Sequence, residues 1–122
     1  MEFTEEFVLD GKNFIYIDFS RVKRKGELIE AFDAIKPIIA KYPENSLYTI
    51  TNVSGVGFDS ELREYLVDYV SHNKPYVKCG AVIGMDGVKK IMSQSILKIG
   101  GRTNMIFAFS KEQAVEMLMK RE

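Results

Sequence analysis

The stretch that decides the fold lies between residues 47 and 62 and reads Leu47-Tyr48-Thr49-Ile50-Thr51-Asn52-Val53-Ser54-Gly55-Val56-Gly57-Phe58-Asp59-Ser60-Glu61-Leu62. Its first part, residues 47–53, is uncharged and rich in β-branched and aromatic residues, which predicts a strand covered on both faces. Gly55 and Gly57 follow, and glycine permits the backbone angles of a sharp turn. We therefore expect a buried strand, a glycine-bearing turn and the start of a helix.

The residues after this turn have the features of a helix N-terminus. Asp59 or Ser60 can cap the helix, because a short side-chain oxygen accepts a hydrogen bond from a free N–H group of the first turn. Glu61 places negative charge near the positive end of the helix dipole. One apolar stripe at helical spacing predicts the buried face of the helix: Leu62, Leu66, Tyr69 and Val70.

Before the central stretch, the pattern predicts a hairpin and a helix. Residues 5–9 and 14–19 are strand-like, and the Asp10-Gly11 turn between them predicts an antiparallel hairpin. Residues 28–42 show helical spacing of apolar side chains. Pro37 removes one backbone hydrogen bond inside that helix, so we expect a kink or a short break near residues 33–37.

After the central stretch, the strand-and-helix pattern repeats. The expected elements are a strand over 77–83, a helix from Asp86 to about residue 99, a strand over 105–109 and a final helix that Ser110 and Gln113 open as a capping box. Strands joined by helices of this length must run parallel. We thus predict an α/β fold in a single domain, residues 1–122, with a five-stranded mixed sheet and about four helices.

Composition and charge limit the function classes. The chain is 46% hydrophobic and 28% charged, with 17 basic and 17 acidic residues and no net charge, which argues against a nucleic-acid binder. No apolar run approaches the roughly 20 residues needed to cross a bilayer, so we expect no stable membrane insertion. The acidic first residues lack the features of a secretory signal, and the lone Cys79 excludes an intramolecular disulfide. We expect a cytoplasmic location.

The segment Asn52-Val53-Ser54-Gly55-Val56-Gly57-Phe58-Asp59-Ser60 resembles the phosphoacceptor segment of the STAS domain family, the anti-sigma-factor-antagonist fold of the SpoIIAA-like superfamily. In that family a strand ends in a small-residue turn and an Asp-Ser pair opens a helix. The order of elements is also similar along nearly the whole chain. The segment from Phe107 to Ala114 looks like the final strand and helix start of the STAS/SEC14-like branch. The resemblance implies a βα superhelix with binding or regulatory roles and no catalysis.

The resemblance makes Ser60 a candidate phosphoacceptor. Phosphorylation there would add a charge of about −1.5 to −2 and change the affinity for a partner. Asp59 could position the phosphoryl group or a metal, and the alternative is that both residues are only helix caps. The expected binding site is the turn and the helix start: Ser54, Gly55, Gly57, Asp59 and Ser60.

A polar rim is expected around this site. Asp18, Asp86 and Ser110, together with Ser54 and Asp59, should follow the carboxyl ends of strands, where open α/β sheets usually bind ligands. The alternative is that each residue starts a loop or helix independently.

Two other stretches suggest phosphate binding, and in both the plainer interpretation is favoured. The glycine turn lacks the third glycine of a dinucleotide fingerprint, and Asp59 and Glu61 would oppose an anion. A basic loop also precedes the first helix, but zero net charge favours a solvated loop over contacts with lipid or nucleic-acid phosphates. Its basic residues are Arg21, Lys23, Arg24 and Lys25.

Three functions are ranked on these grounds. The first is a non-enzymatic binding module that acts through a protein partner. The second is a carrier of a lipid or another small apolar ligand, as the SEC14-like side of the resemblance implies. A small hydrolase ranks last, because His72 and Cys79 have no evident catalytic partners. No spacing suits a zinc or calcium site, so no metal or other cofactor is expected, and a homodimer stays open.

Overall fold

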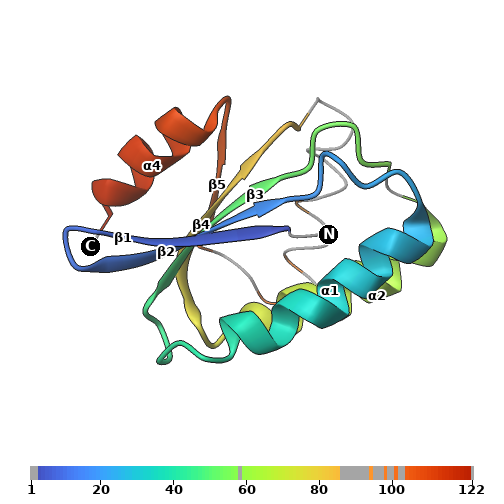
Figure 1. The fold of residues 1–122 in the computed structure, drawn as a ribbon, viewed down its shortest axis with the longest axis horizontal. Helices are drawn as coiled ribbons and strands as arrows, with labels where there is room; N and C mark the ends of the chain where they lie inside the picture. The colour runs from blue at the N-terminus through green and yellow to red at the C-terminus, as the bar shows by residue number, and fades with distance from the viewer. Residues whose placement is uncertain are drawn as a thin grey trace.

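The computed structural model describes residues 3–57, 59–85, 94, 98, 101 and 104–121. They form an α/β fold around one five-stranded sheet with the strand order β1-β2-β3-β4-β5 (Figure 1). The strands are Thr4–Leu9 (β1), Lys12–Asp18 (β2), Leu47–Asn52 (β3), Val77–Ile83 (β4) and Met105–Ala108 (β5). β1 pairs antiparallel with β2, and every later neighbouring pair is parallel. The predicted α/β class and mixed five-stranded sheet are therefore confirmed.

The opening hairpin has the tightest common connection. Leu9 lies opposite Lys12 in the register, so that Asp10 and Gly11 alone form the loop. Both have positive φ, 49° and 76°, as the turn that matches the twist of a two-stranded ribbon requires. This confirms the Asp10-Gly11 turn predicted from the sequence.

Three helices lie within the described residues: Lys25–Ile39 (α1), Ser60–Asn73 (α2) and Lys111–Met119 (α4). In Figure 1, α1 and α2 cover one face of the sheet and α4 covers the other. The expected count for the whole chain was about four helices, and the described residues show three. The helix expected from Asp86 falls almost entirely outside the described residues, which include only positions 94, 98 and 101 of that stretch.

Pro37 does not break the first helix. α1 runs without interruption through Pro37 to Ile39, so the predicted short break is wrong. Pro37 lies in the last turn, where its missing N–H affects only the carbonyl group of Asp33. Both residues are exposed, and water can therefore satisfy that carbonyl.

The core forms two layers, one on each face of the sheet. One cluster joins Ile15 and Ile17 of β2 to Phe32 and other buried residues of α1 and α2. The second joins the opposite face of the sheet, including Ile50, to Leu118 and Ala114 of α4. Since β3 is the middle strand and its residues 47–50 are all buried, no position in that run could hold a solvated charge.

Candidate functional site

The loops that follow β2 and β3 leave the sheet side by side. In the parallel register Asp18 lies opposite Asn52, so both strands end at the same level. The Phe19 N–H then donates to the Asn52 carbonyl oxygen at 2.9 Å, which continues the pairing by one step. Residues 19–24 and residues 53–59 are thereby brought to one edge of the sheet.

Residues 53–57 and Asp59, here called the glycine turn, are held in place by hydrogen bonds. The Ser54 N–H donates to Asn52 Oδ1 at 3.0 Å, and the Val56 N–H donates to the Val53 carbonyl at 3.0 Å. Gly55 has a φ of 76°, a conformation that other residues rarely adopt. The two valines are buried, whereas Ser54, Gly55 and Gly57 are exposed. Phe58 is outside the described residues. The turn therefore anchors itself through its valines and presents its polar backbone outward.

The end of β4 contacts the beginning of the glycine turn. The Val53 N–H donates to the Ile83 carbonyl at 3.0 Å. Gly84 follows with a φ of 87°, and a Cβ atom there would lie 2.5 Å from the Ser54 backbone nitrogen. Sequence reasoning missed this contact. Ile83-Gly84 after a buried strand indicates a turn, but the sequence does not show which segment that turn contacts.

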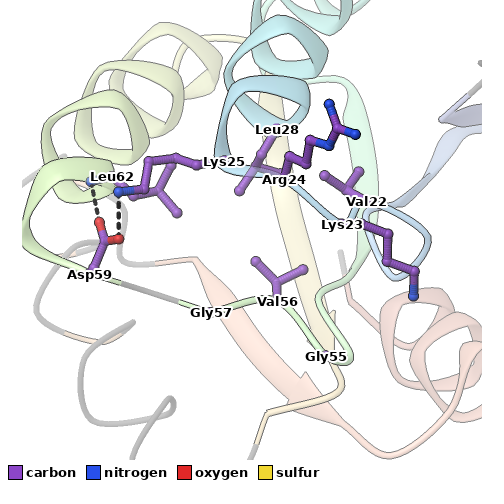
Figure 2. A pocket seen from close by; sticks show the side chains of 10 residues that line it. All are labelled: Val22, Lys23, Arg24, Lys25, Leu28, Gly55, Val56, Gly57, Asp59 and Leu62. Carbon is purple, nitrogen blue, oxygen red and sulfur yellow. Dashed lines mark hydrogen bonds and ion pairs between the residues drawn. The ribbon is translucent and has the colours of Figure 1, made fainter.

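Asp59 is the N-cap of α2 and also the point where α2 is tied to α1. Its Oδ1 accepts a hydrogen bond from the Leu62 N–H at 2.8 Å, and its Oδ2 lies 2.6 Å from Lys25 Nζ (Figure 2). Lys25 is the first residue of α1, and its Nζ also lies 3.0 Å from Glu61 Oε2. The hydrogen bond from Lys25 and then that from the Leu62 N–H lower the pKa of Asp59. The bonds to Asp59 and Glu61 raise the pKa of Lys25.

A pocket of about 280 Å³ lies between the basic loop and the glycine turn (Figure 2). It is lined by Val22, Lys23, Arg24, Lys25, Leu28, Gly55, Val56, Gly57, Asp59 and Leu62. In the sequence, the basic residues and the glycines are two separate features. The parallel pairing of β2 with β3 brings them together, and that pairing was itself predictable from the connecting helix.

The predicted binding residues at the glycine turn and the helix start are all exposed: Ser54, Gly55, Gly57, Asp59 and Ser60. Of these, Gly55, Gly57 and Asp59 line the pocket. Ser60 is the first residue of α2 and carries no capping role, which Asp59 fulfils alone. Of the two capping candidates, the structure therefore selects Asp59.

The predicted rim residues have local roles instead. Asp18 Oδ1 accepts hydrogen bonds from the N–H and the hydroxyl of Ser20, at 2.9 and 2.5 Å. Ser110 caps α4 by accepting from the Gln113 N–H at 3.1 Å, which confirms the serine half of the predicted capping box. Gln113 Oε1 accepts from the N–H of Phe109, the residue before the N-cap, at 2.7 Å, and not from the Ser110 N–H that a capping box pairs with. Neither residue is among those lining the pocket. Asp86 lies outside the described residues.

In the described part of the chain, the residues that could bind a metal or act as an acid or a base lie apart from one another. Within the described ranges, no three His, Cys, Asp or Glu side chains are grouped closely enough to hold a metal ion. His72 lies near the C-terminal end of α2, about 18 Å along the helix from Ser60 at 1.5 Å per residue. Its Nδ1 lies 2.9 Å from Asn73 Oδ1. Cys79 is a free thiol buried in β4.

Among the helices described, none has the length and apolar character that crossing a membrane would require.

No protein-family model matches the chain, and no curated protein matches it. The function is therefore inferred from the geometry of the glycine turn and the pocket beside it.

The close approach of Gly84 to Ser54 leads to a prediction about stability. Gly84→Ala forces a Cβ against the Ser54 backbone at a positive φ, so we expect the free energy of unfolding to fall by about 1–3 kcal/mol. Gly57→Ala is the matched control, because a Cβ there meets nothing within 4 Å, and its effect should stay within about 0.5 kcal/mol. Urea unfolding measures both. Equal losses in the two variants would show that the end of β4 does not support the glycine turn.

The Lys25–Asp59 pair makes a prediction about pH. Asp59→Asn keeps a good capping residue but removes the charge. Because the folded-state pKa of Asp59 lies below its ordinary 3.8, the carboxylate stabilises the fold above pH 3.8. This contribution is lost as the pH falls through the folded-state pKa. We expect wild type to melt above the variant at neutral pH, with a gap that closes in strong acid and narrows in high salt. A gap independent of both pH and salt would rule out the ion pair as its source.

Proposed function

We propose that this chain is a non-enzymatic regulatory module of STAS type that binds a protein partner through the glycine turn and the first turn of α2. One observation carries the proposal: the turn is exposed and polar, yet its backbone is held at both ends. Asn52 and Gly84 hold its beginning, and Asp59 holds its end. A surface that is already ordered loses little conformational entropy when a partner docks on it.

The STAS assignment is supported by the architecture together with one short motif. An antiparallel hairpin leads into parallel strands joined by helices, and the middle strand passes through a small-residue turn to α2. At that junction Asp59 caps the helix and Ser60 begins it. This is the arrangement that the sequence resemblance implies for a phosphoacceptor segment.

Ser60 is well placed to switch such a surface. It is exposed and lies between two carboxylates, Asp59 and Glu61, that share the Lys25 ammonium group. A phosphoryl group of about −1.5 to −2 charge at this position would compete for Lys25 and make the whole docking surface strongly negative. The change in charge would alter the affinity for a charged partner.

The non-enzymatic part of the proposal is supported by the separation of the reactive groups. His72 and Ser60 lie at opposite ends of α2, and Cys79 lies within the sheet with 5% of its surface exposed. A nucleophile and a base must come within hydrogen-bonding reach to act together. A buried free thiol also suits a reducing compartment, in keeping with the proposed cytoplasmic location.

A carrier of a lipid or another purely apolar ligand is supported less well. The pocket of about 280 Å³ lies just below the roughly 300–1,000 Å³ of typical ligand sites. Its lining also includes Lys23, Arg24, Lys25 and Asp59, and an apolar chain would have to desolvate some of these charges.

Charge substitutions test the docking surface. Tagged wild-type chain is used to capture its partner from the native host, and the affinity of the purified pair is then measured. Ser60→Glu should change the Kd by about tenfold or more, since it adds a charge at the centre of the proposed surface. Ser71→Glu is the matched control, because Ser71 is exposed on the same helix near its other end.

Equal affinity of wild type and both variants would contradict docking at the glycine turn. Mapping of phosphate on the chain purified from its host tests the switch separately. Phosphate on Ser60 supports it, and chain that carries none under any growth condition contradicts it while leaving the docking result unaffected.

A further inference from the structure

We propose that the pocket between the basic loop and the glycine turn binds a small organic anion. The oxyanion, a phosphate or a carboxylate, lies at the rim beside Lys23 and Arg24. The apolar body of the ligand lies against Leu28, Val56 and Leu62. This site goes beyond protein docking, because it would recognise a free small molecule.

The floor of the pocket is apolar, and its side chains are almost fully buried. Leu28, Val56 and Leu62 line it with only 3%, 6% and 1% of their surfaces exposed. They come from α1, the glycine turn and α2, so the floor exists only in the folded chain. Since a cavity of about 150 Å³ can hold benzene, 280 Å³ has room for a ring and an attached oxyanion.

The charges around the pocket are distributed unevenly. On the α2 side, Lys25 Nζ lies 2.6 Å from Asp59 and 3.0 Å from Glu61, so its charge is already balanced. Lys23 and Arg24 lie on the opposite side from Asp59 (Figure 2). The excess positive charge of the lining therefore lies at the end away from the carboxylates.

Arg24 can turn toward a ligand at little cost. Its Nε lies 3.9 Å from Glu27 Oε1, at the limit of an ion pair, and 85% of its side chain is exposed. Lys23 is exposed as well. A guanidinium group binds a phosphate or carboxylate through two parallel hydrogen bonds, which is stronger and more specific than a single contact.

The glycines leave the backbone on the other side of the pocket open. A Cβ atom added at Gly55 or Gly57 would meet nothing within 4 Å. A ligand can therefore approach this backbone without displacing a side chain. A small anion also suits a chain with no net charge better than a polyanion does, because only the pocket, and not a whole face, offers excess positive charge.

The test is an amide chemical-shift titration of the purified ¹⁵N-labelled chain. The probes are phenyl phosphate and benzoate, with benzyl alcohol and inorganic phosphate as the matched ligands that lack either the charge or the ring. We expect saturable shifts of the amides of residues 23–28 and 55–57 with at least one of the two organic anions, at about 10 mM or below. The tighter of the two identifies the oxyanion.

The variant Lys23→Ala/Arg24→Ala should weaken that binding about tenfold or more without lowering the melting temperature, because both side chains are exposed. Lys41→Ala/Lys120→Ala removes the same charge from exposed positions elsewhere and should have no such effect. The proposal is overturned if neither organic anion saturates, if benzyl alcohol or inorganic phosphate binds as tightly, or if the control variant weakens binding equally. The assay contains no protein partner, so its result is independent of the docking proposal.

Discussion

The parallel pairing of β2 with β3 is the constraint on which the remaining structure depends. A parallel neighbour can be reached only by crossing back over the sheet, and α1 makes that crossing. Both strands then end at the same edge, with Asp18 level with Asn52. The basic loop and the glycine turn consequently meet there, and the pocket is the space between them.

A single carboxylate, that of Asp59, links the two helices beside this site. Asp59 caps α2 with one oxygen and binds Lys25 of α1 with the other, so a local signal and a long-range contact share one side chain. This dual role changes the effect that the acidic residues at the turn are expected to have on an anion. The sequence alone indicates that they would repel any anion, but in the fold Lys25 balances their charge, and the far side of the pocket is left positive.

Features with a local physical cause were predictable. The uncharged run at 47–53 needed burial on both faces, Asp10-Gly11 needed a positive-φ turn, and Ser110 with Gln113 needed only neighbouring N–H groups. The break at Pro37 was a wrong prediction, because α1 continues through Pro37 to Ile39. Proline there removes one hydrogen bond near the end of the helix, and the residue whose carbonyl loses it, Asp33, is exposed to water.

What depended on contacts distant in sequence was not predictable from single stretches. The support that Gly84 gives to Ser54 and the bond between Lys25 and Asp59 each join segments about 30 residues apart. Neither leaves a periodic pattern in the sequence, since each involves one residue from each segment. The convergence of the basic loop with the glycine turn belongs to the same class. It follows from strand order, a property of the whole sheet.

The central claim is that β3 is the middle strand, in register with β2 on one side and β4 on the other. Backbone nuclear Overhauser effects in the labelled chain test it directly. The register predicts contacts from Ile50 to Tyr16 of β2 and from Ile50 to Ala81 of β4. Contacts to one side only, or to partners shifted along either strand, would contradict the strand order and with it the site that the strand order creates.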